Sequence, residues 1–313
     1  MYFPYVRGRQ YELIALRELV EKGLIGKKIV PIIEPIKPST TLFKTLHAYC
    51  MSEREIAFIH NPKVGDYKKE FNNLNNEKVH DDFIKVLSNH YLINAFLISN
   101  YGIESLSNSG IREKDNNSIM IIFDNQDSSL INEYSRWFNK DTPSFNLIPD
   151  GTSIRRRIKH NKVLFDDKFS RQPKNSDYLE VGDSYFSEDH LFFKEEGYLG
   201  FSDYSIVGAT YSEGGFAPYA VAIHITYFDS NGILRVRHFV SNSNNDYRDP
   251  AGKFSQALGK LISWQSERKL ETYAMKEFED HHQKGTYPGL GPIKKLCLMH
   301  HIELVNNYLE KED

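Results

Sequence analysis

Cysteine and long apolar runs are scarce in this sequence, and each scarcity excludes a class of protein. Cys50 and Cys297 are the two cysteines among 313 residues. Two cysteines cannot build a disulfide framework, which predicts two reduced thiols in a cytosolic protein. No apolar run approaches the roughly 20 residues that span a bilayer, and the first residues lack the basic-then-apolar order of a signal peptide. We therefore expect a cytoplasmic protein with no membrane segment.

Neither sign of charge dominates the sequence. Lys and Arg number 39 against 42 for Asp and Glu, which gives a net charge of −3. This balance excludes a general nucleic-acid binder, so nucleic acid is expected to be contacted only locally if at all. Hydrophobic residues make up 40 % and charged residues 26 %, which is typical of a globular chain. The 20 Phe and 19 Tyr residues provide for a large core.

Short apolar runs, most of them ending in a polar residue, alternate with helix-like segments along the first two thirds of the chain. Near-continuous apolar runs of this kind predict strands buried on both faces, as in a parallel sheet. About eight such strands favour an α/β fold with a (β/α)8 TIM-barrel-like architecture over an open sheet. The expected strands are 29–34, 56–61, 93–98, 118–124, 145–150, 162–166, 204–208 and 219–224. The expected helices are 12–22, 41–51, 81–88 and 129–138.

The last third has a different pattern. Segments 219–228 and 233–240 flank Asn231-Gly232, a dipeptide that supplies the positive φ angles of a tight β-hairpin turn. Helices are expected over 252–264, 271–282 and 293–309. We expect residues 1–313 to form a single barrel-like domain, with 219–313 as either an elaboration of the barrel or a small appended lobe.

Acidic residues follow several of the expected strands, whose carboxyl ends face the functional site in a barrel. Candidate catalytic residues are Glu34, Asp124 and Asp203, and candidate ligands of Mg²⁺ or Mn²⁺ are Glu34, Asp124, Asp150 and Asp166. No cofactor is certain, because Asp also favours helix caps and loops. Glu34 differs from the others because it ends an apolar run without an evident capping role.

Basic residues in three segments are candidates for a local contact with a phosphate-bearing substrate. Lys37 follows Glu34 by three residues and is either a phosphate ligand or a solvated loop lysine. Arg155 and Arg156 follow Asp150 in a segment that resembles an anion site or an exposed helix face. Arg235 and Arg237 alternate along a strand and share one face. The candidate substrate-binding residues are Lys37, Arg155, Arg156, Arg235, Arg237 and His224.

Motifs with established catalytic spacing are absent. There is no Walker loop, G-x-S-x-G, H-E-x-x-H or C-x-x-C. The adjacent pairs His281-His282 and His300-His301 lack the i, i+4 spacing with which two histidines bind one metal. Arg7, Arg9 and Glu12 cluster ahead of the first expected strand and predict structural ion pairs.

Segments at both ends of the chain carry a family resemblance. They are Tyr2–Leu19, Val30–Lys37, His238–Ser241, Gly252–Leu258, Tyr287–Lys295 and His300–Leu304. With these segments the sequence resembles an uncharacterised bacterial family and, more distantly, the phage-type beta-protein family. The resemblance implies a two-gene system in mobile-element or antiviral-defence neighbourhoods, in which the second gene encodes a protein similar to a PD-(D/E)xK nuclease. It supplies no catalytic residues.

Two functions remain open at this point. The chain is either a binding module that recognises or restrains the nuclease-like partner, or a divalent-metal-dependent hydrolase or sensor of a nucleotide-like substrate. The missing catalytic motifs favour the binding module.

Overall fold

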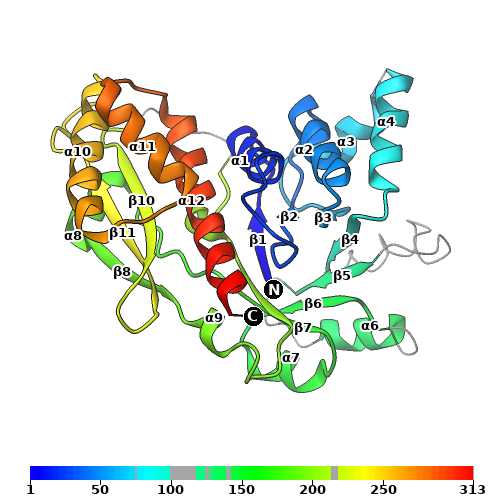
Figure 1. Cartoon of the computed structure of the whole chain (residues 1–313). Helices are drawn as coiled ribbons and strands as arrows, with labels where there is room; N and C mark the ends of the chain where they lie inside the picture. Colours follow the sequence, from blue (N-terminus) through cyan, green and yellow to red (C-terminus); the bar gives the residue numbers. More distant parts are fainter. Residues whose placement is uncertain are drawn as a thin grey trace. The chain divides into compact units, whose positions relative to one another are not determined.

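The structure, a computed structural model, describes residues 1–74, 76–98, 118–123, 127, 129–138, 142–212 and 218–312. The chain folds as two compact units (Figure 1). The first comprises Met1–Asp166 and Asp189–Tyr204, and the second comprises Asp167–Glu188 and Ser205–Asp313. The part that we expected to begin at residue 219 therefore begins at Ser205 and also takes up a segment that interrupts the barrel.

The first unit is a closed barrel of eight parallel strands within the described residues, in the order β1-β2-β3-β4-β5-β6-β7-β9. This confirms the (β/α)8 TIM-barrel-like fold. The strands are β1 (Tyr2–Val6), β2 (Ile32–Ile33), β3 (Ile56–Ile59), β4 (Leu92–Leu97), β5 (Ile119–Ile122), β6 (Phe145–Ile148), β7 (Lys162–Asp166) and β9 (Gly200–Asp203). The helices are α1 (Gln10–Glu21), α2 (Thr40–Met51), α3 (Tyr67–Asn72), α4 (Glu77–Leu87), α6 (Leu130–Trp137), α7 (Thr152–Arg157) and α9 (Asp189–Phe192).

Two of the eight expected barrel strands were wrong, and two that were not expected replace them. Residues 205–207 form the 3₁₀ turn η2 (Ser205–Val207), and 219–224 contribute to a sheet of the second unit. The strands in their place are β1 and β9. Pro4 lies within β1 and Gly200 begins β9, and both residue types weaken a sequence-based strand assignment.

The barrel interior is filled by side chains of alternate strand residues. The centroid of the Phe3 ring on β1 lies 5.0 Å from that of the Phe145 ring on β6. Strands β7 and β9 separate β6 from β1 in the barrel wall, so this contact crosses the interior. Because side chains alternate along a strand, Tyr5 shares this inward face with Phe3. Tyr5 in turn stacks on Phe165 of β7, with ring centroids 5.6 Å apart. The interior is therefore a packed aromatic core.

The second unit contains an antiparallel sheet in the order β10-β11-β8, which confirms the expected hairpin. Its strands are β8 (Asp183–Ser187), β10 (Ala222–Phe228) and β11 (Leu234–Val240). Its helical segments are η1 (Asn175–Asp177), α8 (Tyr178–Val181), α10 (Pro250–Arg268), α11 (Tyr273–Lys284) and α12 (Leu290–Lys311), besides η2.

Helix α12 is the central helix of the second unit, where it packs against β10 and α11. Its apolar side chains Leu296, Ile302 and Val305 are buried, as predicted from an apolar stripe at helical spacing along 293–309, but so are His300 and His301. The helix is therefore buried on more than the expected apolar stripe. Among the described residues of both units, no helix combines the length and apolar composition needed to cross a membrane.

Candidate functional site at the carboxyl end of the barrel

Glu34 follows β2 at the carboxyl end of the barrel and is fully buried. The register of β1 and β2 pairs Tyr5 with Ile32, so Glu34 continues the inward face of these strands. The Tyr5 hydroxyl donates to Oε2 over 2.7 Å, and the Lys63 backbone N–H donates to Oε1 over 2.7 Å. The Arg7 guanidinium forms an ion pair with Oε2. Residues that follow three neighbouring strands therefore meet at one carboxylate.

Aromatic rings complete the surroundings of Arg7. Its guanidinium carbon lies 5.3 Å from the Tyr5 ring centroid and 5.1 Å from that of Tyr204, both within cation–π distance. Burial and the adjacent Glu34 carboxylate raise the pKa of Tyr5 well above its usual value. Burial lowers the pKa of Arg7, but Tyr5 and Glu34 outweigh burial and raise it overall. Arg7 therefore stays cationic, and Tyr5 stays a hydrogen-bond donor.

The loop that carries Arg7 depends on its local sequence. Gly8 has φ +62°, and a Cβ there would lie 3.0 Å from the Glu34 carbonyl oxygen. A side chain at this position would therefore strain the close approach of the two loops. The Glu12 carboxylate accepts the Arg7 backbone N–H over 2.8 Å and holds the loop against α1. The predicted structural ion pairing of this segment is thus confirmed for Arg7, although its partner is Glu34.

This arrangement fixes Glu34 in place more than it prepares the residue for proton transfer. Each carboxylate oxygen already accepts a donor, and Oε2 accepts two. A general acid or base must reach a substrate atom at hydrogen-bond distance. Tyr5, Arg7 and the Lys63 amide occupy three of the about four acceptor positions of the Glu34 carboxylate, and the residue is fully buried. The geometry supports a structural role in which the carboxylate ties three loops together.

The other predicted carboxylates do not gather around Glu34. Asp166 and Asp203 are paired in register, each next to an inward-facing residue, and therefore point to the outer face of the barrel. Asp203 is buried there and accepts the Tyr2 hydroxyl over 2.8 Å. Asp150 lies 3.4 Å from Arg155. Glu34 and Asp203 therefore lie on opposite faces of the barrel wall.

The metal prediction rests in part on Asp124, which lies outside the described residues. Within the described ranges, no group of three or more His, Cys, Asp or Glu side chains is placed to hold a metal ion. Glu34, Asp150 and Asp166 thus do not form such a group with one another. A Mg²⁺ or Mn²⁺ site that includes Asp124 stays a prediction.

The predicted basic residues are dispersed over the two units. Lys37 and Arg156 are exposed. Arg155 lies between Asp150 and Glu196, 3.5 Å from the latter, with its guanidinium over the Tyr198 ring. These contacts fit an exposed helix face better than a phosphate site.

His224, Arg235 and Arg237 belong to the sheet of the second unit, as expected for the two arginines of the hairpin, whereas the expected place of His224 at the end of a barrel strand was wrong. His224 Nδ1 lies 2.8 Å from His238 Nδ1. Burial and the neighbouring His238 lower the pKa of His224 to about 3. Arg235 and Arg237 share one face of β11, as predicted from their alternation.

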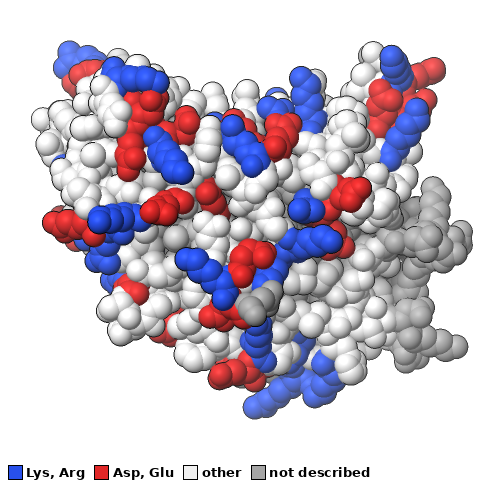
Figure 2. Space-filling model, viewed as in Figure 1, with Lys and Arg blue, Asp and Glu red and all other residues white. Residues whose placement is uncertain are grey.

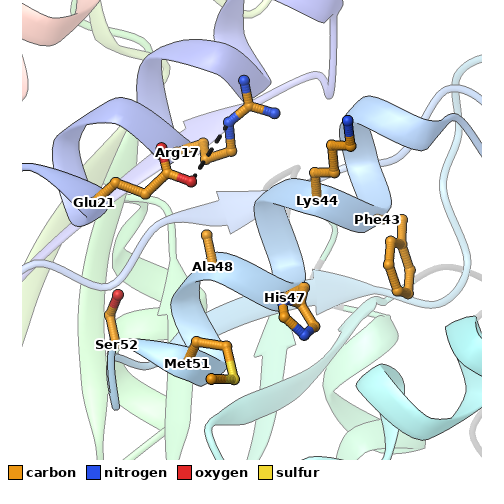
Figure 3. Close-up of a pocket in the computed structure, with 8 residues that line it drawn as sticks. All are labelled: Arg17, Glu21, Phe43, Lys44, His47, Ala48, Met51 and Ser52. Carbon is orange, nitrogen blue, oxygen red and sulfur yellow. Dashed lines mark ion pairs between the residues drawn. The ribbon is translucent and has the colours of Figure 1, made fainter.

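A separate hollow of about 440 Å³ lies on the outer helices α1 and α2 (Figure 3). Its apolar part comes from Phe43, Ala48 and Met51, and the Met51 residue is 71 % exposed. Arg17 and Glu21 on α1 form a 3.8 Å ion pair beside it. The lining residues are Arg17, Glu21, Phe43, Lys44, His47, Ala48, Met51 and Ser52.

The charged side chains give no strong indication of a ligand on the face that Figure 2 shows, where both signs are interspersed. This distribution agrees with the small net charge of the whole chain. Comparisons of the chain with protein-family models, with curated proteins and with solved structures found no match.

Proposed function

We propose that the chain is a protein-binding module that recognises or restrains a nuclease-like partner encoded beside it, within a bacterial defence or mobile-element system. The observation that carries the proposal is the state of Glu34. This residue is the strongest catalytic candidate in the sequence, yet its oxygens are engaged by Tyr5, Arg7 and the Lys63 amide. The nature of the partner rests on the family resemblance.

The hollow on α1 and α2 is the surface that we assign to this partner. Protein interfaces combine an apolar centre with a polar rim, and flexible methionine side chains adapt well to a partner. Phe43, Ala48 and Met51 supply apolar lining, and the Arg17–Glu21 pair supplies charged groups beside them. A hollow of about 440 Å³ accommodates a few apolar side chains of a protein partner.

Co-expression with the neighbouring nuclease-like protein tests the proposal. We expect a complex that elutes as one peak in size-exclusion chromatography at micromolar concentration. Met51→Asp is expected to separate the two proteins without lowering the melting temperature, because the residue is 71 % exposed. Leu179→Asp is the matched control, since Leu179 is also an exposed apolar residue but lies on α8 of the second unit. Two separate, unshifted peaks for the unmodified chain would refute the proposal.

Metal titration tests the alternative, a divalent-metal-dependent hydrolase or sensor of a nucleotide-like substrate. A ligand that binds only the native state stabilises it by about 2.7 kcal/mol at 100 times its dissociation constant. The binding-module proposal expects no change in melting temperature at millimolar Mg²⁺ or Mn²⁺. A rise that Asp124→Asn abolishes would favour the hydrolase. Glu34 is not a suitable target for this test, because its carboxylate has structural partners.

A further inference from the structure

One face of the second unit's sheet carries two arginines, and two tyrosines lie opposite one of them. Arg235 on β11 lies opposite Tyr227 of β10 and Tyr185 of β8, and Arg237 lies opposite Asp183 of β8. Residues directly opposite one another in a sheet share a face. We call the set Arg235, Arg237, Tyr185, Tyr227 and Asp183 the arginine face.

Helix α10 adds two side chains to the arginine face. The Trp264 ring lies 5.2 Å from the Tyr227 ring. The Arg237 guanidinium lies 5.8 Å from the Trp264 ring centroid, and that of Arg268 lies 5.6 Å from it. Arg268 also lies 4.8 Å from the Tyr227 ring centroid. The guanidinium groups therefore rest against aromatic rings, which restricts their motion and leaves their N–H groups for further bonds.

The charges on this face do not cancel. Asp183 accepts Arg235 Nε over 2.7 Å and the Tyr227 hydroxyl over 2.8 Å, so it chiefly neutralises Arg235. Arg237 Nη1 lies 3.9 Å from Asp183 Oδ2, near the distance limit for an ion pair, and the Arg237 side chain is 42 % exposed. Arg268 is exposed as well. Together with Arg268, the arginine face has three guanidinium groups and one carboxylate, so these four groups carry about two positive charges.

We propose that the arginine face, together with Trp264 and Arg268, binds a single-stranded nucleic-acid segment. Arg237 and Arg268 would contact phosphates, and the Tyr185 ring, 51 % exposed, would stack on a base. Single-strand binding surfaces combine basic groups that follow the backbone with aromatic platforms for the bases. An acidic peptide needs the charges but gains little from an exposed aromatic ring beside them, so the ring favours nucleic acid. The proposal does not depend on the protein partner.

Anisotropy of a fluorescein-labelled oligothymidylate with the full chain, at about 50 mM salt, tests this proposal. We expect saturable binding that the double variant Arg237→Ala/Arg268→Ala weakens at least tenfold. Arg248→Ala is the matched control because Arg248 is an exposed arginine (81 %) of the same unit that pairs with Asp246 instead. Two phosphate contacts predict a slope of about −1.4 in log affinity against log salt for single strands.

The base-stacking part has its own readout. Tyr185→Ser is expected to weaken oligothymidylate binding severalfold and to leave binding of polyglutamate unchanged. Equal affinity of the unmodified chain for polyglutamate and oligothymidylate would overturn the proposal in favour of an acidic protein partner. Absence of oligonucleotide binding, or unchanged binding by the double variant, would also overturn it. If the double variant does not fold, Arg268→Gln at the exposed end of α10 is expected to give a severalfold loss on its own.

Discussion

Acidification is expected to unfold the second unit through its buried histidines. His300 on α12 is fully buried, with Nδ1 2.7 Å from the Thr272 hydroxyl oxygen and Nε2 2.7 Å from the Thr226 carbonyl oxygen. The carbonyl accepts only, so Nε2 carries the hydrogen and Nδ1 accepts from Thr272. Burial lowers the pKa of His300 to about 4, and burial together with His300 lowers that of His301 to about 3. Both rings are therefore neutral in the folded state at neutral pH.

The magnitude follows from linkage between protonation and folding. In the unfolded chain the two histidines take up protons below about pH 6.5, whereas in the folded chain they do so only below about 4 and 3. Their contribution to stability is thus complete above about pH 6.5 and is lost as the pH falls toward these lower values. Between pH 7 and pH 5 each histidine costs about 2 kcal/mol of unfolding free energy, or about 4 kcal/mol for the pair. This is a large share of the roughly 5–15 kcal/mol that holds a domain folded.

Urea unfolding at pH 7, 6 and 5 measures this loss. The sequence has two tryptophans, Trp137 in the first unit and Trp264 in the second. In a Trp137→Phe chain the fluorescence therefore reports the second unit. His300→Gln removes one titrating group and is expected to reduce the pH dependence by about 2 kcal/mol over this range. The matched control, His282→Gln, replaces an exposed histidine of α11. Equal pH dependence in the His300→Gln and unmodified chains would refute the reasoning.

The other predictions concern one structural feature of each unit, the buried Glu34 carboxylate in the first and helix α12 in the second. Glu34→Gln leaves the Arg7 charge, whose side chain is only 13 % exposed, without its carboxylate and is expected to destabilise the barrel by about 3–5 kcal/mol in urea unfolding. The more exposed Arg17–Glu21 pair is expected to contribute less than about 1 kcal/mol. Truncation after Gly291 removes nearly all of α12 and is expected to give an insoluble or unfolded second unit, because one buried leucine alone contributes about 2–5 kcal/mol. A truncated chain as heat-stable as the full chain in calorimetry would contradict this.

The barrel was predictable because its strands are buried on both faces and therefore stand out as apolar runs. Ile56–Ile59 and Leu92–Leu97 are such runs, and the structure has strands there. Strand β1 was not predictable in the same way, because proline and charged neighbours obscure its pattern. The pattern of apolar residues shows how a segment is buried, but it does not show which other strands close the barrel. The total of eight was right although two of its members were wrong.

The candidate site was less predictable than the barrel, because it depends on contacts between segments far apart in sequence. Glu34 was identified from its place at the end of an apolar run, but its partners were not. Arg7 and Tyr204 enter the site through β1 and β9, the two strands that the apolar pattern missed. Side-chain alternation separates Asp203 from Glu34, and it requires the strand bounds to within one residue. A signal that was present is the aromatic-basic pattern Tyr5-Val6-Arg7, whose alternation places ring and cation on one strand face.

The two binding proposals use different units, and this separation makes each of them a control for the other. The Glu34 carboxylate is already bound by Tyr5, Arg7 and a backbone amide, so both proposals place ligand binding on surfaces and not in the barrel interior. The hollow with Met51 belongs to the first unit, and the arginine face belongs to the second. If the function is divided in this way, Met51→Asp abolishes partner binding and leaves oligonucleotide affinity unchanged, while Arg237→Ala/Arg268→Ala does the reverse. If either substitution affects both activities, one ligand must depend on the other, and the partner and the nucleic acid then bind as one assembly.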